Sequence, residues 1–312
     1  MLTYASTREE PVRPKQLRFG LLSAEEIRKM AVVRVVDTTL YYRNLPCSGG
    51  LLDPLMGTVD RRHLCASCMR DAKHCQGHAG YMELSWPVYH IGFLDTVLKV
   101  LRTVCFGCSR LSASEEDVHA TLASVQAGGC RSKLTALHAS LRTRKTCPHC
   151  GMARPAYLRS PLGIRVEWSA DVEWESEEER AFCTAPFTAR EAVSILRHMR
   201  DDDCHHLGSD PRTPPPQNMI QQVMVIPPPC TRPAVYASEG SRSRGQNDLT
   251  MKLLDCLRRS NDLHAALGKV DWRDAPDDVM SSADLQEKLQ RLQYEVFTLI
   301  NNNVRGYQKP VA

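Results

Sequence analysis

Eight cysteine and histidine side chains have the types and the spacing of metal ligands. A structural Zn²⁺ ion takes four ligands in tetrahedral geometry, with thiolate sulfurs at about 2.3 Å. A Cys-x2-Cys pair places two thiolates one short turn apart, so that both can reach a single ion. We therefore predict two structural zinc sites, one formed by Cys65, Cys68, Cys75 and His78, and one by Cys105, Cys108, Cys147 and Cys150.

The division into these two sets is the economical one. Pairing the first Cys-x2-Cys with the second would leave Cys75 and His78 unused. In the second set, 38 residues separate Cys108 from Cys147, but the cost of closing a loop grows only logarithmically with its length. Gly77 permits the tight backbone bend that brings the imidazole back after Cys75.

Other interpretations of the cysteines have less support. Unliganded core cysteines have no reason to recur at x2 spacing. A catalytic zinc keeps one position open for water, whereas four protein ligands close the site. The segment Cys204–His206 has the residue types of a third half-site, but no fourth ligand is evident. The remaining cysteines are interpreted as buried or surface thiols: Cys47, Cys130, Cys183, Cys230 and Cys256.

Composition limits the classes of protein that the chain can represent. Its 312 residues, with 24% charged and 42% hydrophobic, are ordinary values for one large domain or a few small ones. Only 6% are aromatic, so small folds here would depend on metal. Thirteen cysteines and no secretory leader predict a reducing compartment. No apolar run approaches the ~18 residues of a membrane span, so we expect no membrane partner.

The ligands must be positioned by a mixture of helices and short strands. The helical pattern over Tyr89–Val104 leads directly into Cys105. Two further helical segments, 115–126 and 133–141, form a hairpin inserted between the halves of the second set. We expect other helices at Ala24–Met30, from a capping box at Thr188, at Leu249–Leu267 and at Ser281–Asn302, with strands at Val32–Val36 and Val223–Ile226. The predicted class is α+β, mainly helical, with two zinc modules.

A series of motifs extends from Phe19 to Asn302. It comprises Ser23–Met30, Gly49–Thr58, Cys75–Gly80, Pro87–Phe93, Val100–Cys108, Val225–Pro233, Asp248–Thr250 and Leu292–Tyr294. In this order they resemble the N-terminal clamp region of the largest subunit of multisubunit DNA-directed RNA polymerase, most closely the RNA polymerase II type. Leu55 departs from the pattern, because the family usually has Arg after Asp-Pro.

The resemblance implies an organisation in three parts. Residues 1–90 would form an N-terminal clamp segment with the first zinc loop, and residues 91–165 the second zinc module with its helical hairpin. Residues 166–312 would form clamp core helices with a lid-like loop at 236–248, ending near the start of the rudder. The chain would then be a fragment or a split subunit.

The resemblance also implies a function. The chain would belong to a nucleotidyltransferase that closes on template DNA and separates the RNA–DNA hybrid. It would not be catalytic alone, because the family's Mg²⁺-binding Asp-x-Asp-x-Asp motif lies downstream and Asp201–Asp203 does not match it. Expected partners are other polymerase subunits, especially the second-largest, in a nucleus or at a viral transcription site. A stand-alone zinc-binding module for DNA or protein interaction is the alternative.

Basic residues in two places are candidates for phosphate contacts. Arg242 and Arg244 lie in the lid-like loop among serines and glycines, which leave the backbone accessible. Arg142, Arg144 and Lys145 form a short basic run just before Cys147. Solvated surface positions are the alternative interpretation of both groups. The net charge of +4 is too small to indicate nucleic-acid binding by itself.

Overall fold

The computed structural model describes residues 20–43, 45–59, 63–125, 130–170, 172, 176–184, 186–208, 215–236, 244–276 and 279–303. Its elements are α1 (Ala24–Met30), β1 (Tyr41–Tyr42), β2 (Leu45–Pro46), η1 (Pro54–Met56), β3 (Gly80–Tyr89), α2 (Leu94–Leu101), α3 (Glu115–Ala123), α4 (Cys130–Ser140), β4 (Ala156–Ser160), β5 (Gly163–Glu167), α5 (Glu177–Thr184), α6 (Ala189–Arg197), α7 (Asp201–His206), η2 (Pro216–Met219), β6 (Ile220–Ile226), η3 (Pro229–Thr231), β7 (Val235–Tyr236), β8 (Arg244–Gly245), α8 (Asp248–Ala266), η4 (Val279–Ser281) and α9 (Ala283–Ile300). Helices mixed with short antiparallel strands confirm the predicted α+β class.

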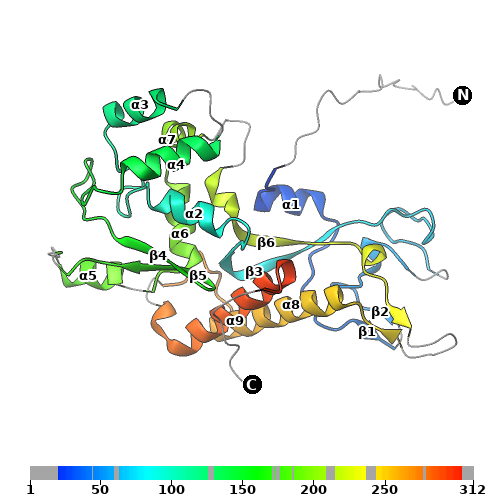
Figure 1. Cartoon of the computed structure of the whole chain (residues 1–312). Helices are drawn as coiled ribbons and strands as arrows, with labels where there is room; N and C mark the ends of the chain where they lie inside the picture. The colour runs from blue at the N-terminus through cyan, green and yellow to red at the C-terminus, as the bar shows by residue number, and fades with distance from the viewer. Residues whose placement is uncertain are drawn as a thin grey trace, which may run out of the picture.

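A two-stranded pair, β3 with β6, forms the middle of the molecule (Figure 1). The strands are antiparallel, with Gly80 opposite Ile226 and Tyr89 opposite Ile220. The helices α8 and α9 pack on each other and on β3, and α6 also packs on β3. The last two helices, α8 and α9, therefore form a packed pair.

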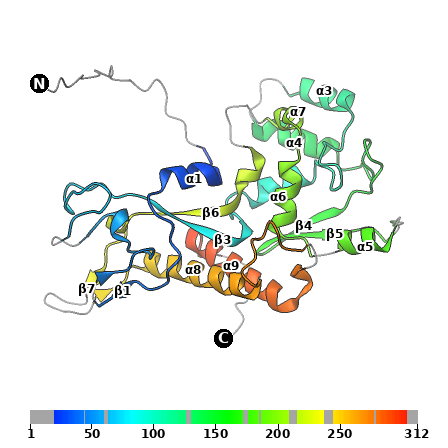
Figure 2. The same ribbon diagram turned by 180° about the vertical axis from the view of Figure 1, so that it is seen from behind.

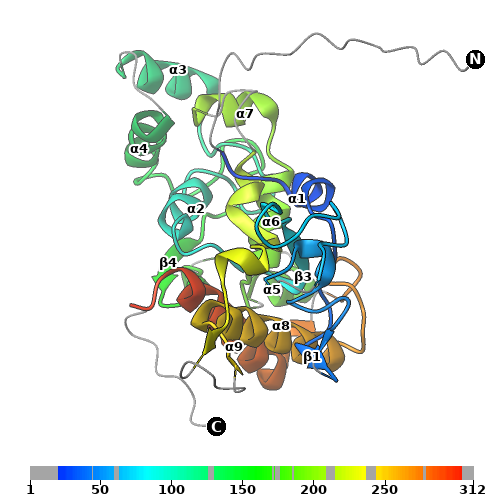
Figure 3. The same ribbon diagram turned by 90° about the vertical axis from the view of Figure 1, so that its right-hand side faces the viewer.

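Two apolar clusters meet at β3. In the first, β3 residues such as Trp86 pack with α8 and α9, for example with Leu253 and Val296. In the second, Tyr89 packs with α2, α4 and α6, for example with Leu101 and Leu137. Figure 3 shows this arrangement from the side, with α8 and α9 below and α3, α4 and α7 above. The strand thus connects the helical hairpin to the upper module.

A single glutamine joins the end of β3 to α9. Its side-chain amide accepts a hydrogen bond from the N–H of Tyr89 at 2.8 Å and donates one to the carbonyl of Tyr89 at 2.9 Å. Gln293 and Tyr89 are both buried. The amide therefore satisfies two backbone groups that would otherwise be buried without a partner.

Replacing Gln293 with alanine is expected to lower the free energy of unfolding by about 2–3 kcal/mol, because two buried backbone groups lose their partners. Urea unfolding followed by circular dichroism measures the change. Gln290 is exposed on the same helix, so Gln290→Ala serves as the matched control and should change stability by less than about 0.5 kcal/mol. Equal effects of the two substitutions would contradict the role given to Gln293.

Two sequence predictions need correction. The segment Val32–Val36 does not form a strand. Within it, only Arg34 makes a β-bridge, with Tyr81, and the next N–H groups, from Val36 onward, donate to the carbonyl of Gly49 instead. The helix expected over Tyr89–Val104 begins only at Leu94, because β3 continues to Tyr89. Pairing with Ile220 keeps Tyr89 in the strand, a tertiary effect that the local pattern does not contain, and residues 91–93 form a turn before α2.

Other local predictions are confirmed. Ser23 and Thr188 both act as N-caps with capping boxes, each with a glutamate three residues on. The helices α3 and α4 form the expected hairpin, although they begin and end a few residues from the predicted bounds. In the part of the chain that the structure describes, no helix is both long and apolar enough to cross a membrane.

Candidate metal centres

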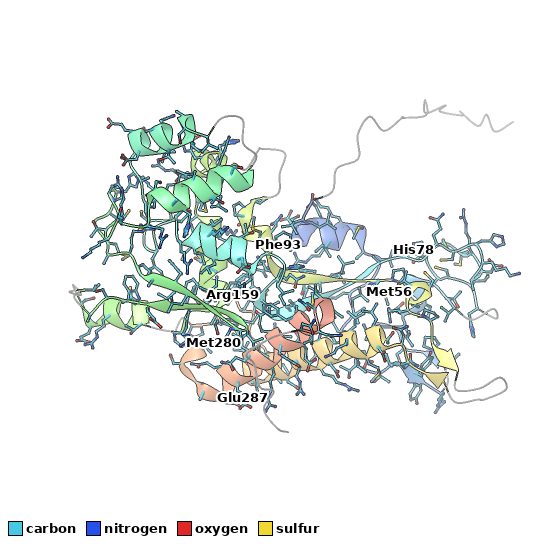
Figure 4. All side chains as sticks on the ribbon, viewed as in Figure 1. Met56, His78, Phe93, Arg159, Met280 and Glu287 are labelled. Atoms are coloured by element: carbon cyan, nitrogen blue, oxygen red, sulfur yellow. The ribbon has the colours of Figure 1, made fainter. Side chains whose placement is uncertain are left out.

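The first cysteine-rich group lies in a loop at one end of the molecule. The ligand atoms of Cys65, Cys68, Cys75 and His78 all lie within 4.8 Å of one another. The sulfur of Cys75 is 3.7 Å from Nε2 of His78. Figure 4 shows His78 at this end, with Met56 on the side nearer the β3–β6 pair.

Three successive carbonyls of η1 hold this loop. The carbonyl of Pro54 accepts the N–H of Ala66 at 3.1 Å, and that of Met56 accepts the N–H of His78 at 3.0 Å. The carbonyl of Leu55 accepts the hydroxyl of Ser67 at 2.6 Å. Both halves of the ligand set are therefore fixed to one short 3-10 turn. The departure at Leu55 does not disturb this arrangement, because these contacts use its backbone.

The buried carboxylate of Asp53 shapes the turn itself. It accepts the N–H of Leu55 at 2.8 Å and the N–H of Gly49 at 2.5 Å. Gly77, between Cys75 and His78, has φ +84°, as expected for the tight bend. A Cβ on Gly77 would lie 2.6 Å from both Pro228 and the sulfur of Cys230. Close contact with the proline-rich segment after β6 is thus a second reason for glycine here.

The second group lies at the opposite end, beside α4 and β4 (Figures 1 and 2). The ligand atoms of Cys105, Cys108, Cys147 and Cys150 also lie within 4.8 Å of one another. Sulfur–sulfur distances are 3.5 Å for Cys105 and Cys150, and 3.7 Å for Cys108 and Cys147. The α3–α4 hairpin therefore brings the two Cys-x2-Cys halves together.

Each Cys-x2-Cys pair forms the same turn. The N–H of the first cysteine donates to the carbonyl five residues later, as Cys105 does to Arg110 at 2.8 Å and Cys147 to Met152 at 2.9 Å. The residue directly after the second cysteine has positive φ, which is +55° at Met69 and Ser109 and +75° at Gly151. Sequence spacing alone did not reveal this shared conformation.

Replacing Gly151 with alanine is expected to destabilise the second module by about 1 kcal/mol, since an L side chain disfavours positive φ. No atom lies within 4 Å of the position of the added Cβ, so the cost comes from the backbone alone. Thermal unfolding of the metal-loaded chain measures it. Met69 occupies the equivalent position of the first turn and is 72% exposed. Met69→Gly is therefore the reciprocal control, and it should not lower the stability of the chain. A Gly151→Ala variant that unfolds at the same temperature as the unsubstituted chain would contradict the strain argument.

Both groups fit a tetrahedral metal ion. Sulfurs at about 2.3 Å from a central ion lie ~3.8 Å apart in tetrahedral geometry, close to the distances observed. Burial raises the pKa of Cys75 to about 11 and holds that of Cys105 above the ordinary thiol range. Burial would also raise the pKa of Cys65 and Cys147, but N–H donors of the turn and neighbouring thiols lower both. A divalent cation would replace the thiol protons, so the two sites are compatible with two zinc ions.

The other sequence-predicted residues are dispersed. Arg142 and Lys145 are exposed, whereas Arg144 forms an ion pair with Asp117. Arg242 lies outside the described residues, and Arg244 is described only by its backbone, in β8. In the described part of the chain, only the two groups above could hold a metal among clusters of His, Cys, Asp and Glu. Cys204 is therefore not part of such a group.

The remaining cysteines form no disulfide among the residues whose side chains the structure describes. Cys183 and Cys256 are buried, Cys47 is half-buried and Cys230 is exposed. Burial raises the pKa of Cys256 to about 12. The side chain of Cys130 lies outside the described part. These thiols match the simple interpretation given to them from the sequence.

Comparison with known protein families places the chain. The model of the family described as RNA polymerase Rpb1, domain 1, matches residues 12–311. The chain belongs to this family. The resemblance to the N-terminal region of the largest polymerase subunit is thereby confirmed.

Two curated relatives of this Rpb1-family chain come from distant organisms. The DNA-directed RNA polymerase II subunit RPB1 of Euplotoides octocarinatus is 31% identical over 304 residues, which cover 94% of this chain and 60% of the relative. The DNA-directed RNA polymerase subunit Rpo1N of Thermococcus celer is 30% identical over 295 residues, which cover 92% of this chain and 31% of the relative. The chain thus spans only part of the length of either relative.

Proposed function

We propose that this chain is the clamp portion of the largest subunit of a DNA-directed RNA polymerase, contributing to closure on template DNA and to separation of the RNA–DNA hybrid. The family match over residues 12–311 carries the proposal. The fold supports it, because two metal groups are attached at opposite ends of one packed β3–β6 core. Such a body can move as a unit against nucleic acid.

The proposed parts are the three inferred from the sequence. They are an N-terminal clamp segment at 1–90, a second zinc module at 91–165 and clamp core helices at 166–312. Their boundaries can be tested by limited proteolysis. The pairing of β3 with β6 and the packing of α8 on β3 would join the first part to the third.

Both metals are proposed to be structural Zn²⁺. Three cysteines with one histidine, and four cysteines, are ligand sets that zinc prefers. When bound, the ions would close both loops and leave no open position for a water nucleophile. The chain's own contribution is to orient the ligands through the η1 carbonyls and the repeated turn after each cysteine pair.

Nucleic-acid contacts are proposed for Arg242 and Arg244 of the lid-like loop at 236–248, and for Arg142, Arg144 and Lys145 of the second module. The pairing of Tyr236 with Arg244 supports a hairpin-like base for the loop. Phosphate contacts by arginine and lysine predict affinity that falls with salt and shows little base preference.

The enzyme activity belongs to the complete polymerase. We propose that the chain contributes to a nucleotidyltransferase whose Mg²⁺-binding aspartates lie downstream, and that other polymerase subunits, especially the second-largest, are its partners. A nuclear location is proposed by analogy with the eukaryotic relative, or a viral transcription site if the gene is viral. The archaeal relative shows that the family is not confined to nuclei.

Co-purification tests this function. The full chain, co-expressed with the downstream part of the largest subunit and the second-largest subunit, is expected to be captured with both. The assembled complex should bind a DNA–RNA scaffold with salt-dependent affinity. A chain that binds DNA alone but joins no polymerase subunit would favour a stand-alone zinc-binding interaction module and would overturn the clamp proposal.

A further inference from the structure

A basic pocket of about 470 Å³ lies beside the second metal group, between the end of α4 and the start of β4. Four arginines and one histidine line it, and the rest of its wall is formed by Leu141, Pro155, Ala156, Tyr157 and Leu158. The five are Arg102, His138, Arg142, Arg144 and Arg154. Among the described residues, the lining contains no carboxylate-bearing side chain.

Backbone carbonyls, which carry no net charge, hold two of the arginines in place. Nε of Arg102 donates to the carbonyl of Tyr157 at 3.0 Å. Nη1 of Arg154 donates to the carbonyls of Leu141 and Arg144 at 2.7 and 3.2 Å, respectively. These bonds orient both guanidinium groups, and in the described part of the chain neither has a carboxylate partner. Cys105 and Cys147 of the second metal group act on Arg154 electrostatically. Each guanidinium group also retains N–H donors beyond those used in these contacts.

Arg142 and Arg144 differ in their surroundings. Arg144 pairs with Asp117, so most of its charge is balanced locally. Arg142 is exposed, and its guanidinium has no hydrogen-bond or ion-pair partner in the described part of the chain. The pKa of His138 is lowered by burial and then by Arg102, Lys99, Arg142 and Arg154. The region around the pocket is therefore cationic.

We propose that this pocket, with Arg102, Arg142 and Arg154 around it, binds a phosphate group. Guanidinium groups match the geometry of phosphate oxygens and form paired hydrogen bonds with them. Two of the three are already fixed by carbonyls, so little side-chain entropy is lost on binding. The phosphate belongs either to a nucleic-acid backbone or to a small free phosphate. The first source rests on the proposed polymerase function, and the second does not.

The proposal separates Arg142 from the other basic residues of its run. Lys145 does not line the pocket, and Arg144 is paired. Arg142 is therefore the residue whose loss should reduce phosphate binding without disturbing the fold. Arg197 is also exposed, lies outside the pocket on α6 and has no side-chain partner in the described part of the chain. Arg197→Gln thus provides the same change in charge as a control.

The test uses the metal-loaded full chain in two assays. Fluorescence anisotropy measures binding of a labelled mixed-sequence oligonucleotide, and isothermal titration calorimetry measures binding of inorganic phosphate at matched ionic strength. Arg142→Gln is expected to weaken oligonucleotide binding about three- to tenfold and to reduce the salt slope by about one. Arg197→Gln should change the affinity less than about twofold.

The outcomes distinguish this inference from the proposed function. Oligonucleotide binding that is weakened in Arg142→Gln but not in Arg197→Gln supports the pocket. If inorganic phosphate then competes with the oligonucleotide, the pocket binds free phosphate as well as a nucleic-acid backbone. If both variants weaken oligonucleotide binding equally, or if neither weakens it, the proposed phosphate site is overturned. The clamp proposal is then unaffected. Phosphate binding that depends on Arg142, without oligonucleotide binding, supports the pocket and contradicts a nucleic-acid contact by this module. Absence of both kinds of binding overturns the inference.

Discussion

Replacing Cys105 with alanine is expected to reduce the metal content from two zinc ions to one per chain and to unfold the second module. Binding of a structural zinc ion contributes on the order of 10 kcal/mol to the folding of a small metal-dependent unit. Helix α3 has little apolar packing of its own to hold it, because Val118 is its only buried residue in the described structure. Elemental analysis and far-UV circular dichroism measure the two effects.

The matched control is Cys256→Ala, in α8. Both thiols are almost fully buried, at 1% exposure for Cys105 and 0% for Cys256, and both substitutions remove the same atom. Cys256 lies outside both metal groups, so its variant should keep two ions and lose only about 1–2 kcal/mol of stability. A Cys105→Ala chain that retained both ions, or a wild-type chain without metal, would refute the zinc proposal.

The metal content should also depend on pH in a definite direction. Burial keeps the pKa of Cys105 above the ordinary thiol range and raises that of Cys75 to about 11. Each of these thiols must therefore lose a proton when a cation binds, and acid competes with the metal. Affinity is highest at alkaline pH and falls as the pH decreases below neutral. The release of protons on metal binding can be measured directly in weakly buffered solution.

Replacing Arg232 with alanine is expected to lower the free energy of unfolding by about 3 kcal/mol or more. The side chain is 2% exposed and donates to the carbonyl of Pro227 at 3.0 Å, to the hydroxyl of Thr250 at 3.2 Å and to the carbonyl of Leu51. Its loss leaves two buried acceptors and one half-buried acceptor without this donor and opens a cavity. Each lost buried partner costs about 1–3 kcal/mol. Urea unfolding of the metal-loaded chain measures the change.

Lysine is not expected to rescue this position. Burial lowers the pKa of Arg232 to about 10, so the site already opposes a charge, and one ammonium group lacks the planar fork that reaches three acceptors. Arg258→Ala is the control, because the Arg258 side chain is 51% exposed and, among the described residues, its ion pair is with Asp255 on the same helix. That substitution should change stability by less than about 0.5 kcal/mol. Full stability of Arg232→Lys would contradict the argument from geometry.

Arg232 also shows what a resemblance to a family leaves out. The sequence placed it in a proline-rich segment before the lid-like loop, without a physical role. The structure shows that its guanidinium connects the segment before the first metal loop, the end of β6 and α8. No local pattern predicts this, because the three acceptors are brought together only by the packing of distant segments.

The residue types and their spacing determined the metal sets, because a thiolate pair two residues apart is a local arrangement that survives any packing of the rest. Local hydrogen bonding likewise determined the capping boxes at Ser23 and Thr188. Tertiary structure alone decided that β3 pairs with β6, since strand pairing joins residues far apart in the chain, and it placed Tyr89 in a strand. It also decided that the two metal groups lie at opposite ends, and that arginines just after α2, just after α4 and just before β4 line one pocket. Such contacts depend on long-range burial and charge, and a linear pattern does not encode which distant segments will meet.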